Sequence, residues 1–409
     1  MDALDALTPF AASRLRASVL APFVQTYSDR LSEQRYAPHT VRQYLNCLAH
    51  FAHWSAGRQI DLRALDHHIA NFIDQHLPRC KCADPVQRNR HQVRAALRHL
   101  KTVVRNAGVQ VDDGPSDPID EQIRRFDQHL LHAKGLAAST RLRRAAIIRS
   151  LLCATANSAT PSADELRQFL TQELSRISAA SAGVTTTAVR SYLRFRAFEG
   201  DRIEHLLAIV GKPAAWRLAP LPQTLMPDEV QRLLDAFPAE LASRLRCYAI
   251  VRCLVDLGLR SSEVTALELD DLDWTAGIVR ISKGKSRRAD VLPLPQSTGA
   301  AIAHYIRSER PPTTNRRIFV RHVAPVDEPV GTDVVRHAVR DAYRRCGLPY
   351  TGVHILRHTL ASRLLNTGGT LKEVADVLRH RELDTSLIYA KVDVGRLGAV
   401  AMPWPGSRP

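Results

Sequence analysis

Three segments near the N-terminus of this 409-residue chain recur in the same order farther along. Each pair shares the apolar positions of an amphipathic helix. Ordered repeats at a nearly constant offset indicate repeated structural units, so the pattern predicts a duplicated helical module of about 90 residues. The general similarity of amphipathic helices is the alternative explanation. The offsets are 100, 97 and 96 residues, for segments that begin at Tyr36 and Leu136, Ile69 and Leu166, and Val93 and Val189.

Both copies carry arginines between the apolar positions of their helices, and the whole chain is basic. It has 57 lysines and arginines against 41 acidic residues, a formal net charge of +16. Such a charge favours a polyanionic partner, because each cation that binds a phosphate releases a counterion. We therefore expect duplex DNA as the partner, with an acidic membrane surface as the weaker alternative. The arginines could also simply form a solvated charged face that binds no partner. The arginines are Arg94 and Arg98 in one copy and Arg190, Arg194 and Arg196 in the other.

Two breaks rich in proline and glycine, VDDGPSDP and GKPAAWRLAPLP, divide the chain. After the second break, helical periodicity covers about residues 227 to 270, and GIVRIS and ADVLPL then flank a basic turn as a β-hairpin. The expected fold class is mostly α with a small β-sheet (α+β). The predicted domains are a helical N-terminal module at 1–110, a second helical DNA-binding domain at 119–205, a linker at 206–224 and a mixed domain at 225–409.

The N-terminal sequence predicts neither secretion nor a membrane span, since it lacks a basic segment followed by an apolar one. Seven cysteines, an odd number spread thinly, indicate reduced thiols and a cytoplasmic protein. Cys80 and Cys82, with His76 and His91 nearby, could be a zinc site. However, C-x-C lacks the usual spacing of zinc ligands, so the sequence argues against a metal. No cofactor is expected.

The C-terminal stretch HILRHTLASRLLNTGGTLKEVADVLRHRELDTSLIYAKVD concentrates unlike polar residues in a short region. His354 and Arg357 are three residues apart and share one face of a predicted helix. His380 follows at the end of the next helix, which begins with a predicted capping box at Thr370. Tyr389 lies in a last short helix. A tyrosine between apolar residues is usually part of a core, so only the combination suggests a reactive site.

Two further candidates lie upstream. Arg260 follows a predicted helix, with Glu263 three residues later, and the simple explanation is a surface ion pair worth little. Lys283 lies in the basic hairpin turn, where Lys285 competes for any specific role and a solvated loop is the alternative.

Together these motifs resemble the tyrosine recombinase, or phage integrase, family. The resemblance is carried by LGLRSSEVTALELDDLDW, the hairpin lysine in SKGK, HILRH, LRHREL and LIYAKV, in that order, and it covers about residues 225 to 400. The family often has glycine before the second histidine, where this chain has Arg379. The resemblance implies an active site made of Arg260, Lys283, His354, Arg357, His380 and Tyr389.

The resemblance also implies a role for each residue. Tyr389 would attack the scissile phosphate and form a covalent 3′-phosphotyrosyl link, without metal or ATP. Arg260 and Arg357 would clamp the phosphate with planar guanidinium groups, and His380 would add a hydrogen bond. Lys283 would protonate the leaving 5′ oxygen, and His354 would accept the tyrosine proton.

By the same resemblance, four copies would assemble on paired duplex DNA sites and exchange strands through a Holliday junction. The ending AMPWPG is similar to recombinases of transposons and integrative elements. The leading expectation is a site-specific recombinase or integrase. The alternatives are a type IB topoisomerase-like activity and a DNA-binding accessory protein that depends on partner recombinases.

Overall fold

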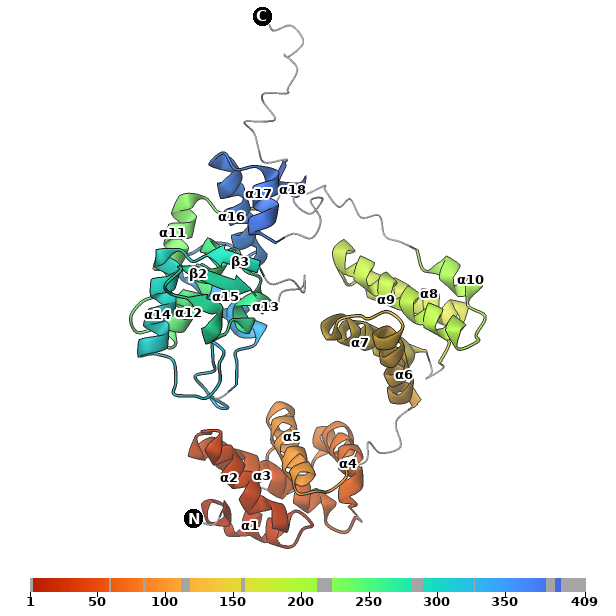
Figure 1. Ribbon diagram of the computed structural model, residues 1–409. Coiled ribbons are helices and arrows are strands. Elements are labelled where there is room, and N and C mark those ends of the chain that lie inside the picture. The colour runs from red at the N-terminus through yellow and green to blue at the C-terminus, as the bar shows by residue number, and fades with distance from the viewer. Residues whose placement is uncertain are drawn as a thin grey trace, which may run out of the picture. The chain divides into compact units, whose positions relative to one another are not determined.

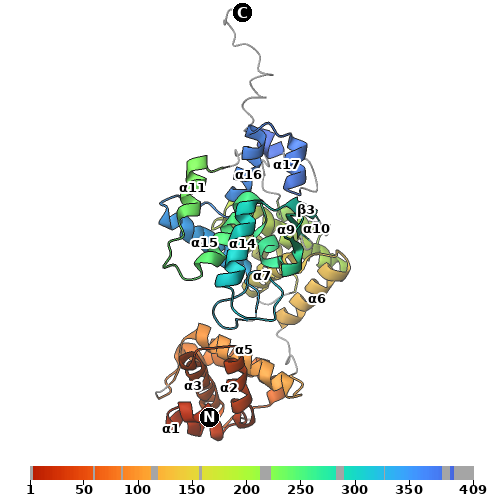
Figure 2. The same ribbon diagram turned by 60° about the vertical axis from the view of Figure 1, so that its left-hand side comes forward.

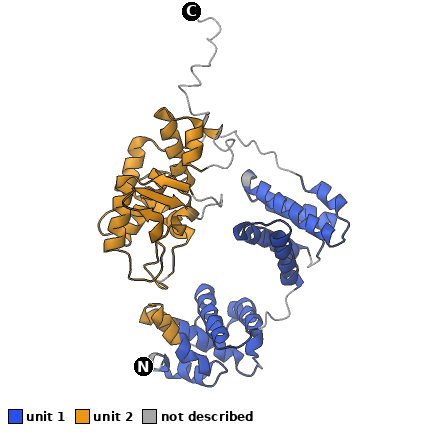
Figure 3. Ribbon diagram, in the orientation of Figure 1, with its two compact units in different colours: residues 1–27, 44–217 blue, residues 28–43, 218–409 orange. Residues whose placement is uncertain are grey.

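The computed structural model describes residues 3–58, 60–83, 86–111, 118–155, 159–211, 223–281, 290–326, 328–379 and 387–390. The chain divides into two compact units, one made of residues 1–27 and 44–217 and the other of residues 28–43 and 218–409 (Figure 3). Among the described residues, no helix has both the length and the apolar character that crossing a membrane requires.

Helices make up the first part of the chain, up to residue 111. The last of them, α5, shows why: the Asn89 side chain caps its first turn, and Val93, Leu97 and Leu100 recur on one buried face. A single π-helical turn, η4 (Phe72–His76), and a 3-10 turn, η5 (Leu77–Arg79), precede it. The helices are α1 (Pro9–Arg16), α2 (Val24–Glu33), α3 (Pro38–Ser55), α4 (Leu65–Asn71) and α5 (Arg90–Asn106), with 3-10 turns η1 (Ala3–Ala6), η2 (Ala21–Phe23) and η3 (Leu62–Ala64).

A second helical group follows and parallels the first. Helix α7 begins 100 residues after α3, and α8 begins 98 residues after α4. The helices therefore occur in the order that a duplicated module requires. The domain limits at residues 110, 119 and 205 remain a prediction from the sequence. The predicted linker at 206–224 begins inside α10, and its residues 212–222 lie outside the described part. The helices are α6 (Pro118–His132), α7 (Ala138–Ala154), α8 (Ala163–Leu174), α9 (Ala179–Phe198) and α10 (Glu204–Ile209).

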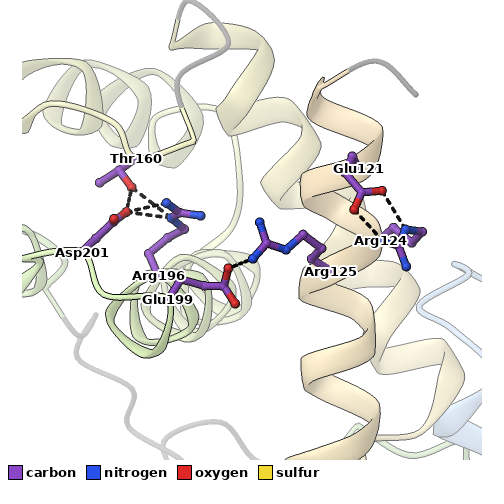
Figure 4. A network of polar contacts seen from close by, with 7 residues as sticks. All are labelled: Glu121, Arg124, Arg125, Thr160, Arg196, Glu199 and Asp201. Atoms are coloured by element: carbon purple, nitrogen blue, oxygen red, sulfur yellow. Dashed lines mark hydrogen bonds and ion pairs between the residues drawn. The ribbon is translucent and has the colours of Figure 1, made fainter. Parts of the chain in front are cut away.

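Several arginines of this second group bind partners within it. Arg196 pairs with Asp201 at 2.7 Å, and Arg125 pairs with Glu199 (Figure 4). Arg190 donates to the carbonyl oxygens of Leu207 and Val210. Of the three arginines that the sequence assigned to a DNA-facing surface here, only Arg194 is exposed, and Arg190 and Arg196 are partly buried.

The second unit is mixed, as the sequence predicted. The stretch with helical periodicity from 227 to 270 forms three separate helices, and Pro227 lies in the first turn of α11. The helices are α11 (Pro227–Asp235), α12 (Arg244–Asp256), α13 (Ser261–Ala266), α14 (Gln296–Ser308), α15 (Thr332–Arg345), α16 (His354–Asn366), α17 (Leu371–Val377) and α18 (Leu387–Ala390), and η6 (Leu269–Asp271) is a 3-10 turn.

The predicted hairpin is confirmed. Strands β2 (Ile278–Ile281) and β3 (Asp290–Pro293) pair antiparallel, with Val279 opposite Leu292, and β1 (Leu272–Asp273) pairs with the other edge of β2. Both Val279 and Leu292 belong to a buried core that also contains residues of α12, α14 and α15. Helices α16 and α17 lie side by side at one end of this unit in both views (Figures 1 and 2).

Candidate active site

Four of the six residues proposed from the sequence lie in the described part of the second unit. Arg260 immediately precedes α13, His354 and Arg357 lie in the first turn of α16, and Tyr389 lies in α18. The other two, Lys283 and His380, lie outside the described residues.

The turn before Arg260 is held by a glycine. Gly258 has φ +58°, and a Cβ atom there would lie 2.8 Å from Cδ2 of Leu360 and 2.9 Å from Cδ2 of Leu378. Glycine suits this position, because its φ is left-handed and any Cβ atom would push the two leucine side chains aside. The backbone of this turn therefore lies directly against α16 and the end of α17, and its carbonyl reaches Arg357.

Arg357 is buried, with 6% of its surface exposed, and it is anchored on both sides. Its Nη1 donates to the Gly258 carbonyl at 2.5 Å, and its Nη2 donates to the Leu378 carbonyl. Burial, followed by the charges of Arg260 and Arg379, lowers the pKa of Arg357 to about 9. The two carbonyls use only part of the donor capacity of a guanidinium, which has five N–H groups.

Glu263 joins two arginines at the edge of this site. One carboxylate oxygen lies 2.7 Å from Nη1 of Arg260, and the other lies 2.7 Å from Nη2 of Arg379. Burial raises the pKa of Glu263, but the charge of Arg379 and the hydrogen bonds from Arg260 outweigh burial and keep it below its usual value. The pair of Arg260 with Glu263 that the sequence offered does form, but it is not a surface pair, because the Glu263 side chain is 2% exposed. The Arg379 side chain is 3% exposed, so its pair with Glu263 is a second, buried ion pair.

The sequence suggested no role for the charge of Arg379, and its ion pair with Glu263 supplies one. The backbone of Arg379 has φ +54°, a left-handed conformation that glycine adopts without strain. The family's frequent glycine at this position fits that conformation. In this chain an arginine takes the same conformation and places its guanidinium on Glu263.

Tyr389 is buried in an apolar cluster but keeps a polar contact. Its ring packs with Leu360 and Leu378, and its surface is 1% exposed. Its hydroxyl lies 2.8 Å from Nδ1 of His358. Burial raises the pKa of Tyr389 to about 12, although Arg357 and Arg260 act in the opposite direction. The tyrosine thus belongs to the core and also presents a bonded hydroxyl near two cations.

His358 is a residue that the sequence reasoning missed. Burial, and then the neighbouring His354 and Arg357, lower the pKa of His358, so the imidazole is neutral at pH 7. It lies one turn after His354 and directly after Arg357 on α16, inside the HILRH motif. The i, i+4 spacing from His354 was the available signal. His354 itself is exposed.

Solved structures share the fold of this chain. XerH site-specific recombinase bound to palindromic difH matches with a TM-score of 0.54 and 19% identity, over 84% of this chain and 98% of that one. The Tn1549 transposon integrase in complex with transposon right-end DNA matches with a TM-score of 0.53 and 16% identity, over 68% and 99%.

Sequence comparisons match the C-terminal part of the chain and, for at least one relative, nearly all of it. The Phage integrase family model matches residues 223–396. The Sinorhizobium fredii protein y4rA, provisionally named an integrase/recombinase, is 34% identical over 97% of both chains. The tyrosine recombinase XerD of Corynebacterium glutamicum is 29% identical over 57% of this chain and 76% of its own. The chain therefore belongs to the phage integrase family and is a tyrosine-type site-specific recombinase.

Proposed function

We propose that this recombinase cleaves and rejoins duplex DNA through a covalent 3′-phosphotyrosyl intermediate, with Tyr389 as the nucleophile. The observation that carries the proposal is the Tyr389 hydroxyl, which is hydrogen bonded to His358 and close enough to Arg260 and Arg357 for both to lower its pKa. A nucleophile bonded to a base and placed beside cations is the arrangement that such a reaction needs.

The two arginines supply the positive charge that a phosphodiester requires as it is attacked. Arg357 is held by two backbone carbonyls and Arg260 by Glu263, so both guanidinium groups are already oriented. Preoriented donors stabilise developing negative charge better than mobile ones, because no reorganisation is needed during the reaction. We propose that Arg260 and Arg357 bind the non-bridging oxygens of the scissile phosphate.

The proton of Tyr389 is proposed to move to His358. In the tautomer protonated at Nε2, Nδ1 of the neutral imidazole accepts the hydroxyl proton. The 3′-phosphotyrosyl bond then forms as the bond to the 5′ oxygen breaks. Lys283 is proposed to protonate that oxygen. His380 is proposed to donate a hydrogen bond to the phosphate, and His354 to assist the transfer of the tyrosine proton. These three roles rest on the family resemblance.

The reaction as proposed is a transesterification, so the energy of the broken bond is conserved in the tyrosyl link. A 5′-hydroxyl on a second strand reverses the step, and neither ATP nor a metal ion is needed for the roles assigned here. We infer that copies of the chain assemble on paired DNA sites, as a tetramer, and that the sites belong to a mobile element. The Tn1549 transposon integrase is the relative in fold that supports the mobile element.

The test is covalent capture on DNA. Wild type and Tyr389→Phe would be mixed with nicked suicide substrates, drawn from DNA flanking the gene, and run on a denaturing gel. Only wild type should form a protein–DNA adduct, because the variant lacks the nucleophilic oxygen, and both should bind the DNA equally in a gel shift. Tyr350→Phe is the matched control, since Tyr350 is 39% exposed.

The other outcomes separate the alternatives. An adduct with Tyr389→Phe would place the nucleophile elsewhere. Binding without any adduct in wild type would favour an accessory protein that needs partner recombinases. Relaxation of supercoiled DNA without any site requirement would favour a topoisomerase-like activity.

A further inference from the structure

Four potential metal ligands gather in the N-terminal unit, far along the chain from the active site. They are His50 on α3, His76 at the end of η4, and Cys80 and Cys82 in the loop after η5. Their ligand atoms all lie within 4.8 Å of one another. Among the residues that the structure describes, no other group of three or more histidine, cysteine or acidic side chains meets in this way.

Three of the distances within this Cys₂His₂ cluster are close to the edges of a tetrahedral site, and all of them lie within 4.8 Å. Nε2 of His50 lies 3.4 Å from Nε2 of His76 and 3.3 Å from Sγ of Cys80, and Sγ of Cys82 lies 3.5 Å from Nε2 of His76. Zinc bonds of about 2.0–2.1 Å to nitrogen and about 2.3 Å to sulfur give tetrahedral edges of about 3.3 Å between nitrogens and about 3.6 Å between nitrogen and sulfur. The three measured distances are therefore close to those expected around one zinc ion.

His50 is oriented as a metal ligand would be. It is fully buried, and its Nδ1 lies 2.9 Å from the carbonyl oxygen of Gln87. That bond places the proton on Nδ1 and leaves the lone pair of Nε2 directed into the cluster. Phe72 packs edge-on against the His50 ring and stacks on the His76 ring. Both imidazoles are thus fixed by groups outside the cluster.

The surroundings also suit the charge of a thiolate pair. Arg88 donates to the carbonyl oxygen of Cys82 at 2.8 Å, and Arg14 donates to that of Ala83 at 3.2 Å. Two thiolates and two neutral imidazoles neutralise a divalent cation, and its binding releases the two thiol protons to solvent. A two-iron cluster is a poorer fit, because there the cysteine pair and the histidine pair bind different iron atoms.

We propose that His50, His76, Cys80 and Cys82 bind one structural Zn²⁺ ion. Four protein ligands leave no open position, which is typical of structural and not of catalytic zinc. The ion would join the loop between η5 and α5 to α3 and so stabilise the N-terminal unit. The sequence offered His91 as the fourth ligand and argued against zinc from the C-x-C spacing. The structure instead brings in His50, which precedes Cys80 by 30 residues.

The first test is the metal content of the full chain, purified without chelators and measured by plasma mass spectrometry. Wild type should contain about one zinc per chain, whereas Cys82→Ser and His50→Gln should lose it. Cys153→Ser is the matched control, because Cys153 is an exposed thiol outside the cluster, and it should keep its zinc. Tyr389→Phe should also keep its zinc, so this result is independent of the proposed DNA cleavage.

The second test remains decisive even where a ligand variant fails to fold. Zinc would be removed from wild type with a chelator and replaced by Co²⁺, followed by absorption spectroscopy. The thiolate charge-transfer band and the intense d–d bands of tetrahedral Co²⁺ should appear and saturate at one equivalent, and Zn²⁺ should abolish them. Wild-type protein that carries no zinc and shows no tetrahedral cobalt spectrum would overturn the proposal.

Discussion

The reactive hydroxyl of Tyr389 lies in an environment that opposes its ionisation. Burial raises its pKa to about 12, and only the cations nearby act in the other direction. A proton acceptor that is neutral at physiological pH is therefore valuable, and His358 meets that need because burial lowers its own pKa. The role of His358 can be tested through pH, since protonated imidazole cannot accept the proton.

We predict that single-turnover cleavage by wild type rises with pH through the lowered pKa of His358, below 6.5, and then levels off. Below that pKa the imidazole is protonated and cannot act as the base. His358→Asn keeps a hydrogen-bonding group that does not titrate, so it should lose this rise and about 10²- to 10⁴-fold in rate. His354→Asn should keep the rise. A rise lost in His354→Asn but retained in His358→Asn would make His354 the base.

Arg379 combines a strained backbone with a buried ion pair, and two substitutions separate these effects. Both Arg379→Gly and Arg379→Ala remove the pair with Glu263, but only glycine relieves the left-handed φ of +54°. Arg379→Gly should therefore be more stable than Arg379→Ala by about 1 kcal/mol. Denaturant unfolding of the two variants measures the difference, and equal midpoints with equal slopes would contradict it.

At the scale of elements, the site depends on how closely α16 and α17 approach the turn before α13. Gly258 is the contact, and its carbonyl also holds Arg357. Gly258 thus determines both how closely the turn packs against these helices and how Arg357, a proposed catalytic residue, is oriented.

Gly258→Ala should consequently cost more stability than Gly277→Ala. Both glycines have a positive φ, of +58° and +64°, but a Cβ atom at position 277 meets nothing within 4 Å. The shared backbone strain cancels in the comparison, and the overlap with Leu360 and Leu378 should add about 1–3 kcal/mol at position 258. Thermal unfolding measures the stability, and cleavage by Gly258→Ala should fall as its carbonyl moves. Equal losses in both variants would show that the two leucines simply move aside.

At the scale of the whole molecule, the net charge of +16 favours DNA, but many arginines are committed to internal partners. Arg90 pairs with Asp74 at 2.5 Å, and Arg196 with Asp201 at 2.7 Å. Arg94 and Arg98, on the same helix as Arg90, are exposed. We therefore expect only some of the basic residues, such as Arg94 and Arg98, to bind DNA phosphates.

Replacing Arg94 and Arg98 together with alanine should weaken DNA binding and reduce its dependence on salt. Each lost phosphate contact makes the negative slope of log K against log salt less steep by about 1. The slope of the double variant should therefore be less steep than that of wild type by about 2. Arg90→Ala lowers the net charge equally per residue, but Arg90, although exposed, is already paired with Asp74, so its slope should stay close to wild type. Fluorescence anisotropy over a salt series gives the slopes. An unchanged slope in the double variant would place the N-terminal helices away from the DNA.

The sequence by itself determined the local features of this protein. The capping box at Thr370, the hairpin pairing of β2 with β3 and the helix that carries His354 and Arg357 all follow from patterns within a few residues. Such features depend on spacing along the backbone, which the sequence states directly. The family motifs are also local, and for this reason the chain could be assigned to tyrosine recombinases before its structure.

Only the tertiary structure decided which distant side chains meet. Arg379 reaches Glu263 across 116 residues, Tyr389 bonds His358 across 31, and His50 joins Cys80 across 30. These contacts are set by the packing of helices against turns and loops, and packing depends on the whole core and not on any local spacing. The sequence therefore placed Arg260, Arg357 and Tyr389 in one candidate site, whereas the folded chain assigned Arg379 its partner and brought the fourth potential zinc ligand into place.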